Sequence, residues 1–161
     1  MSLYASPPFY TSHYELGVSQ TSRQIAEYTV EIRNHASETI SFGWRKVLIQ
    51  QLREIQSRND KAGWDGYQAI PITRQTMFAA IIFLMLLPDY IEIPDIVPEP
   101  TGEIGFLWEK ENDITFIVSV SSETLVFVEL FGSSKSHGER KFLRELPDNI
   151  EKTLLNYFRI S

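Results

Sequence analysis

Residues 103–131, with the sequence EIGFLWEKENDITFIVSVSSETLVFVELF, decide the fold. Apolar and polar side chains alternate along two of its segments, residues 103–109 and 114–120. The apolar faces are Ile104, Phe106 and Trp108 in the first segment, and Ile114, Phe116, Val118 and Val120 in the second. Alternation with a period of two is typical of half-buried antiparallel strands.

A third alternating segment, residues 124–131, places Val126, Val128 and Leu130 on one face and Glu129 on the other. The connectors at 111–113 and 121–123 are short and polar, as hairpins require. The sequence therefore predicts a three-stranded antiparallel meander. Residues 132–140 are polar and are expected to form a loop before a closing helix that begins near Pro147 or Asp148.

Two helices are predicted before the sheet. Apolar residues spaced by four, four and three mark an amphipathic helix: Trp44, Leu48, Leu52 and Ile55. The second helix is expected to begin after a cap at Thr73 and to stop before Pro88. Because residues 77–87 are apolar on every side, we expect a central buried helix at about 73–87.

Prolines at 88, 94, 98 and 100 predict an extended connector between this helix and the sheet, with an edge strand around residues 91–93. The predicted fold class is therefore α+β, with two helices, a three-stranded antiparallel meander and a C-terminal helix, and with the sheet covered on one side. Residues 1–21 are expected to form an irregular arm, and residues 22–161 a single domain. Residues 22–33 fit either a helix or a strand, and we favour a helix capped by Ser22.

Composition narrows the function classes. With 43% hydrophobic and 22% charged residues, the chain resembles an ordinary globular domain. It has no cysteine, which excludes disulfides, thiolate metal sites and cysteine nucleophiles. The net charge of −6 argues against a nucleic-acid partner. The longest apolar run, residues 77–87, is too short to span a bilayer, which needs about 20 residues, so we expect no membrane span and a cytoplasmic location.

The first candidate functional motif is Gly63-Trp64-Asp65-Gly66-Tyr67. Two glycines around an acidic residue predict a tight turn with unusual backbone angles. One interpretation is structural, with the aromatics anchoring a turn between helices and Asp65 capping it. The other makes Trp64, Asp65 and Tyr67 a contact patch for a ligand or partner, since aromatics and a carboxylate on a rigid loop suit recognition.

The second motif is the segment 98–108, PEPTGEIGFLW, which enters the first predicted strand through two prolines. Gly105 inside the strand predicts a bulge or a close approach by another backbone. Glu103 is expected to cap a turn or to face a cleft. We include Glu103 and Trp108 with the candidate contact residues of the first motif.

Together the two motifs resemble a family of small, uncharacterised bacterial proteins. Those proteins carry a Trp-Asp-Gly-Tyr turn followed by Ala and Pro-Ile, and a later Pro-x-Pro-x-Gly-Glu-Ile-Gly segment. The matching residues here are Trp64, Asp65, Gly66, Tyr67, Ala69, Pro71 and Ile72, then Pro98, Pro100, Gly102, Glu103, Ile104, Gly105 and Trp108. The resemblance covers residues 43–158 and departs at Gln68 and Thr101, where glycine and an acidic residue or asparagine are expected. It implies a shared fold and names no activity.

Enzyme signatures are weak in this sequence. The three histidines, His13, His35 and His137, lack the spacing of a metal site. No phosphate-binding loop or nucleophile elbow occurs. We therefore expect no cofactor and no metal, and favour a non-catalytic module that binds a partner protein. The alternative is a small-ligand binder or enzyme that uses a cleft near Asp65 and Glu103, provided that the two motifs meet in space.

Overall fold

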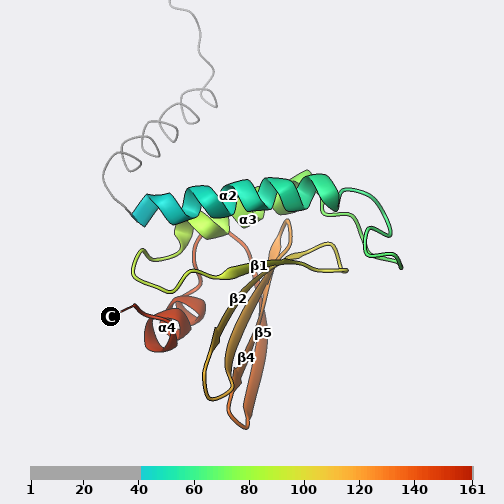
Figure 1. Cartoon of the computed structure of the whole chain (residues 1–161). Helices are drawn as coiled ribbons and strands as arrows, with labels where there is room; N and C mark the ends of the chain where they lie inside the picture. Colours follow the sequence, from blue (N-terminus) through green and yellow to red (C-terminus); the bar gives the residue numbers. More distant parts are fainter. Residues whose placement is uncertain (1–40, 161) are drawn as a thin grey trace, which may run out of the picture. The chain divides into compact units, whose positions relative to one another are not determined.

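The computed structural model describes residues 41–160, so the predictions made for the first forty residues lie outside the described part of the chain. The described chain is an α+β domain with an antiparallel sheet and three helices (Figure 1). In chain order its elements are α2 (Ser41–Arg58), α3 (Arg74–Leu86), β1 (Asp95–Pro98), β2 (Ile104–Lys110), β3 (Ile114–Val120), β4 (Thr124–Phe131), β5 (Ser134–Lys141) and α4 (Asp148–Tyr157).

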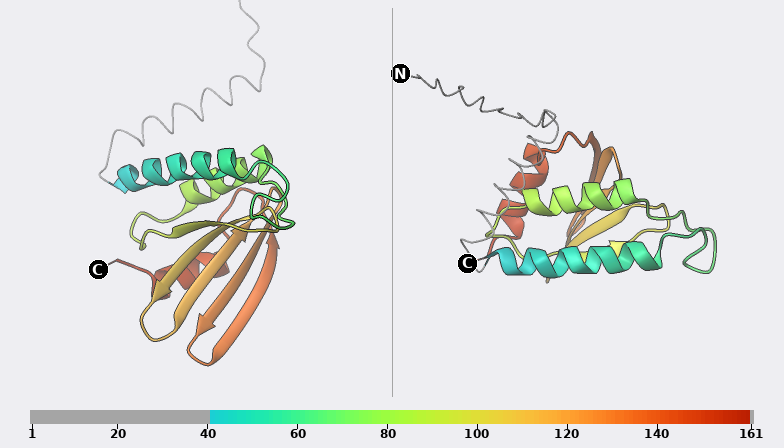
Figure 2. Two further views of the ribbon diagram at one scale, coloured as in Figure 1. Left: turned by 45° about the vertical axis from the view of Figure 1, so that its right-hand side comes forward. Right: turned by 90° about the horizontal axis from the view of Figure 1, so that it is seen from above.

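The two helices predicted before the sheet are present and run antiparallel, side by side (Figures 1 and 2). The predicted stripe of α2 faces inward, with Leu48 and Leu52 buried. Thr73 caps α3 as expected, because its side chain accepts a hydrogen bond from the backbone N–H of Thr76. α3 is less enclosed than predicted. Phe83 and Leu84 are fully buried, but Phe78 is 56% exposed, because α2 and the sheet cover only part of the helix.

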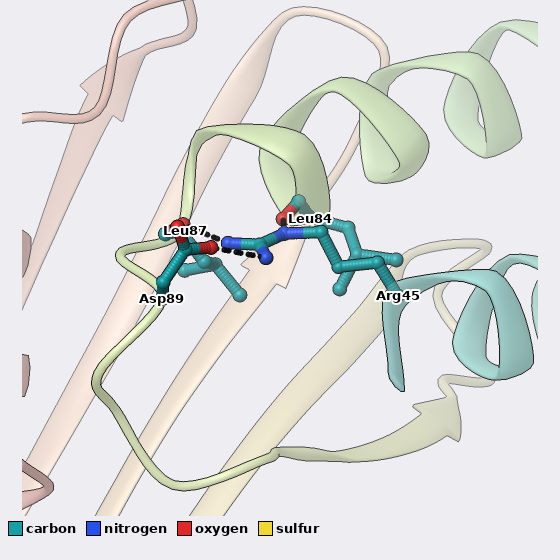
Figure 3. Close-up of polar contacts among 4 residues, drawn as sticks. All are labelled: Arg45, Leu84, Leu87 and Asp89. Atoms are coloured by element: carbon teal, nitrogen blue, oxygen red, sulfur yellow. Dashed lines mark hydrogen bonds and ion pairs between the residues drawn. The ribbon is translucent and has the colours of Figure 1, made fainter. Parts of the chain in front are cut away.

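Arg45 connects the two helices at the C-terminal end of α3 (Figure 3). Its guanidinium is buried and donates hydrogen bonds to the backbone carbonyls of Leu84 and Leu87 and to the carboxylate of Asp89. The carbonyls at a helix C-terminus have no partner within the helix and carry partial negative charge. The Arg45 guanidinium of α2 therefore supplies hydrogen-bond donors to the carbonyls at the C-terminal end of α3, and it ties the two helices together at this point.

The sheet has five strands in the order β1-β2-β3-β4-β5, all antiparallel. The predicted meander is present as β2, β3 and β4, but the sheet has two more strands than the three predicted, β1 and β5. The N-terminal edge strand is β1 at 95–98, not at 91–93, and Pro98 is tolerated because β1 lies at the edge of the sheet. Residues 134–141, all but the last of which were predicted as a loop, form β5. Gly132, with φ of 61°, supplies the first position of the two-residue turn that returns the chain beside β4.

The two faces of the sheet differ in what covers them. The inner face is covered by α3 and by α4 with the residue after it. Phe83 of α3 packs on Phe106 at 4.9 Å between ring centroids, and Phe158 packs on Trp108 and Phe116 at 6.4 Å. The buried side chains of this face are Ile96, Ile104, Phe106, Trp108, Phe116, Val118, Val120, Leu125 and Phe127.

No described helix or strand packs over the opposite, outer face. Its apolar side chains are all at least partly exposed: Val97, Leu107, Ile117, Val126, Val128 and Leu130. The alternation predicted for β4 is correct, but the buried face is the one that holds Leu125, Phe127 and Glu129. Glu129 is accommodated there because Thr153 of α4 and Ser136 of β5 each donate a hydrogen bond of 2.6 Å to its carboxylate.

Candidate functional site

The loop that follows α2 is held by its own polar groups. The backbone N–H of Gly63 donates to the carbonyl of Ala69, and that of Gly66 donates to the carbonyl of Gly63. Gly63 and Gly66 have φ of 71° and 86°, as the turn predicted from the sequence requires. Hydrogen bonds that close a loop on itself restrict its motion, so the loop presents its side chains in one arrangement.

Asp65 and Trp64 hold this loop from inside. One carboxylate oxygen of Asp65 accepts hydrogen bonds from the backbone N–H groups of Tyr67 and Ala69, at 2.9 and 3.2 Å. The indole N–H of Trp64 donates to the carbonyl of Ile70 at 3.0 Å. Both side chains therefore contribute to the shape of the loop. Tyr67, in contrast, is 86% exposed and Ile70 is 56% exposed, so these two side chains are available for contact.

The two sequence motifs meet in space. The backbone N–H of Ile70 donates to the carbonyl of Pro100 at 2.7 Å, which places the loop beside the turn between β1 and β2 (Figure 1). Gly102 lies at the contact. It has φ of 86°, and a Cβ atom at this position would lie 2.9 Å from the Cγ2 of Ile70. Glycine is therefore required at 102 both for the backbone angle and for the close packing of the two segments.

Glu99 lies in the turn between β1 and β2, and its side chain lies over the outer face of the sheet. Its carboxylate accepts a hydrogen bond of 2.6 Å from Ser119 of β3. A Cβ atom on Gly105 of β2 would lie 2.6 Å from the same carboxylate. Gly105 and Ser119 are paired across β2 and β3 without interruption, so Gly105 marks no bulge; it leaves room for the Glu99 side chain, not for another backbone.

The pKa of the Glu99 carboxyl is raised above its ordinary value. Burial raises the pKa of its carboxyl, the hydrogen bond from Ser119 lowers it, and the neighbouring carboxylate of Glu103 raises it further. Glu103 accepts a hydrogen bond from Thr101 at 2.9 Å. A half-buried carboxylate beside a second one favours the approach of a positively charged group, because either a proton or a cation relieves their repulsion.

The candidate residues named from the sequence thus separate into three roles. Trp64 and Asp65 hold the loop, Tyr67 projects from it, and Glu103 lies beside Glu99 on the turn that the loop contacts. Trp108 is elsewhere: it is 2% exposed on the inner face, where its indole N–H donates to the carbonyl of Glu92. Its alternation with Ile104 and Phe106 already indicated a core position.

The strand register places the outer face beside these groups. Val97, Gly105, Ser119 and Val126 follow one another across β1 to β4, and the next row is Asp95, Leu107, Ile117 and Val128. Glu99 therefore lies at one margin of an apolar area. We call Leu107, Ile117, Val126, Val128 and Leu130 the outer patch, and the carboxylates of Asp95, Glu99, Glu103 and Glu109 its acidic margin.

Sequence reasoning missed both the outer patch and the role of Glu99. The alternation of β4 contained the signal for the patch, because Leu125 and Phe127 are as apolar as Val126 and Val128. A strand that is apolar on both faces can be buried on both or can offer one face to a partner. The signal for Glu99 was the glycine at 105 opposite the serine at 119. The glycine leaves space for the Glu99 side chain, and the serine donates a hydrogen bond to it.

Among residues 41–160, no three His, Asp or Glu side chains are grouped so that they could hold a metal ion, and no helix is long and apolar enough to cross a membrane. Comparisons with protein-family models, with curated proteins and with solved structures find no match to this chain. The resemblance to small bacterial proteins stays a prediction, and function has to be inferred from the geometry.

Proposed function

We propose that this protein is a non-catalytic interaction module whose outer patch binds a partner protein. The observation that carries the proposal is the apolar character of a sheet face that no described element covers. Five aliphatic side chains in adjoining positions of β2, β3 and β4 remain partly exposed to water. Contiguous exposed apolar surface costs free energy in water and is typical of surfaces that bind other proteins.

The acidic margin specifies the chemistry of the partner. Asp95 and Glu109 are exposed beside the patch, and Glu99 is half-buried at its end. A matching surface would carry an apolar area flanked by lysine or arginine side chains. Such charges favour association through long-range attraction and are screened by salt, so binding should weaken as ionic strength rises.

We assign the loop at residues 63–70 to the same contact surface, because Ile70 contacts the β1–β2 turn on which Glu99 lies. Tyr67 supplies an exposed aromatic ring with few rotatable bonds, held on a loop that its own hydrogen bonds restrain. An aromatic side chain in this setting loses little conformational entropy on binding and buries a large area. We therefore assign Tyr67 and Ile70 to the contact surface, and Trp64 and Asp65 to the support beneath it.

Affinity capture with matched variants tests the proposal. The full-length chain is used as bait in three forms: wild type, Val128→Asn in the outer patch, and Val47→Asn on α2, where the valine is 66% exposed. Both variants replace a valine at the surface by the same polar residue. We expect one protein to be retained in stoichiometric amount by wild type and Val47→Asn and lost by Val128→Asn. Equal recovery by all three forms, or by none, would contradict the proposal.

The half-buried carboxyl of Glu99 favours one alternative, the binding of a small cationic ligand beside Glu103. Because the carboxylate of Asp65 serves its own loop, that site would use Glu99 and Glu103 instead of the pair named from the sequence. Titration with spermidine, followed by the NMR shift of the Glu99 carboxyl carbon, distinguishes this small-ligand site from the proposed binding of a partner protein. A saturable shift that is abolished in Glu99→Gln supports the alternative, and an unchanged spectrum removes it.

A further inference from the structure

β5 is the most exposed strand of the described sheet, and among residues 41–160 no strand pairs with its outer edge, where the Arg140 guanidinium donates a hydrogen bond to the carbonyl of Glu139. It spans Ser134–Lys141, and seven of its eight residues are exposed, with only Gly138 partly buried. Eight residues of strand present an edge of roughly 27 Å. An edge of this length is a template for pairing with another chain unless the protein protects it.

The β4–β5 turn determines which backbone groups face this edge. Phe131 pairs with Ser134 across the two-residue turn at Gly132 and Ser133, and a turn of this kind closes on a hydrogen-bonded pair. Ser134 and every second residue after it therefore direct their N–H and C=O groups toward β4. Lys135, His137 and Glu139 direct theirs to the free edge.

The charges along β5 are complementary to themselves. In an antiparallel pair of two β5 strands centred on His137, Lys135 of each copy lies opposite the partner's Glu139. All of these positions have their backbone groups directed to the free edge, so the same register satisfies the hydrogen-bonding pattern. Moving the centre to Gly138 would place Lys135 opposite the partner's Lys141, and like charges directly opposite are destabilising.

We propose that two copies of this chain associate through β5, antiparallel and centred on His137, to form a continuous ten-stranded sheet. Two Lys135–Glu139 pairs then flank a central His137 pair on the outer face of the sheet. A two-fold axis through the centre makes the contact self-complementary, so the assembly closes at two copies. Lysine on an edge strand normally discourages pairing; here the same lysine selects one partner and one register.

The dimer is separate from the proposed partner contact. It uses the edge of the sheet, whereas the outer patch lies on β2, β3 and β4. The two outer patches would face the same side of the extended sheet, so a partner with two matching surfaces could engage both copies at once. Dimerisation would then raise the apparent affinity without any new contact between the chains.

Charge-reversal variants of the full-length chain test the register by sedimentation velocity over a range of concentrations. Lys135→Glu and Glu139→Lys should each weaken the dimer by about tenfold or more, because two attractive pairs become repulsive. The double variant Lys135→Glu/Glu139→Lys should restore the wild-type dissociation constant. Lys141→Glu is the matched control, since it changes charge in the same strand without an opposite charge in this register, and it should have little effect.

A second variant tests the edge without changing the paired charges. His137→Pro removes an N–H that faces the free edge and leaves the hydrogen bonds to β4 intact, so a folded monomer is expected. Circular dichroism verifies that each variant remains folded. A wild-type protein that is monomeric at all concentrations overturns the proposal, and so does a dimer that withstands the single reversals or is not restored by the double variant.

Discussion

The inner and outer faces of the sheet are built from the same strands by the same alternation, yet only one of them is core. On the inner face, Phe106, Phe116 and Val118 are completely buried beneath α3, α4 and Phe158. On the outer face, Ile117 and Val128 are apolar as well but remain partly exposed. The side chains of the two faces are similar in type, and the main difference is that helices pack over one face and no described helix packs over the other. Hydrophobicity alone therefore does not identify a core, and an apolar face without a cover is a candidate for binding.

The largest expected difference between the faces is in the cost of truncating valine. Val118→Ala, on the inner face of β3, should lower the free energy of unfolding by about 2 kcal/mol or more, because it leaves a cavity in packed surroundings. Val128→Ala, on the outer face of β4, should cost less than about 1 kcal/mol. Urea unfolding monitored by tryptophan fluorescence measures both. Equal costs would mean that the outer face is packed in the folded protein.

A smaller difference is expected for the two glycines that lie beneath a side chain. A Cβ atom on Gly138 would lie 2.4 Å from the Phe127 ring on the inner face, and one on Gly105 would lie 2.6 Å from the Glu99 carboxylate on the outer face. The ring is held by its neighbours, whereas the carboxylate ends a flexible chain that can turn into water. Gly138→Ala should therefore destabilise by about 1–3 kcal/mol and Gly105→Ala by less than about 1 kcal/mol. Thermal unfolding of the two variants measures the difference, and the reverse order would contradict the assignment of the faces.

The smallest effect is expected at Glu99, where the outer face holds a carboxyl that is only half-buried. Burial raises its pKa, so the folded state binds this proton more tightly than the unfolded state. The resulting contribution to stability is present below the ordinary pKa and is lost as pH rises through the raised value. At neutral pH the charge opposes folding, and Glu99→Gln should unfold at a slightly higher temperature than wild type. The difference should shrink on acidification below pH ~4. A variant that is less stable than wild type at neutral pH would show that the Ser119 hydrogen bond to the carboxylate outweighs burial.

Elements with a strong hydrophobic period were predictable from the sequence. The stripe of α2, the cap at Thr73, and the strands β2, β3 and β4 all follow from local patterns. β5 was not predictable in this way. Its residues are polar on both faces, and it forms because the turn at Gly132 returns the chain beside β4. β1 was misplaced since residues 91–93 and 96–97 are similarly apolar, and the register with β2 selects the later segment.

The sequence predicted the individual motifs of the candidate site, but not the contacts that their residues make in space. The glycines at 63 and 66 indicated the turn, but the use of Asp65 by its own loop depends on backbone geometry. The contact between the two motifs runs through the backbone of Ile70 and Pro100, and its trace in the sequence is Gly102, which by itself does not identify the segment that packs against it. Trp108 belonged to the core pattern, and the structure places it on the buried inner face of the sheet, away from the other candidate contact residues.

The most direct test of the central claim, that the outer patch is open in the folded protein, is the rate of thiol labelling at single cysteines. The chain contains no cysteine, so Val128→Cys, Val47→Cys and Val118→Cys each introduce one thiol into the full-length protein. We predict that Val128→Cys reacts at a rate close to that of the exposed Val47→Cys, and that addition of the captured partner slows it. A free protein in which Val128→Cys reacts as slowly as the buried Val118→Cys would show that the outer face is already covered, and would contradict the claim.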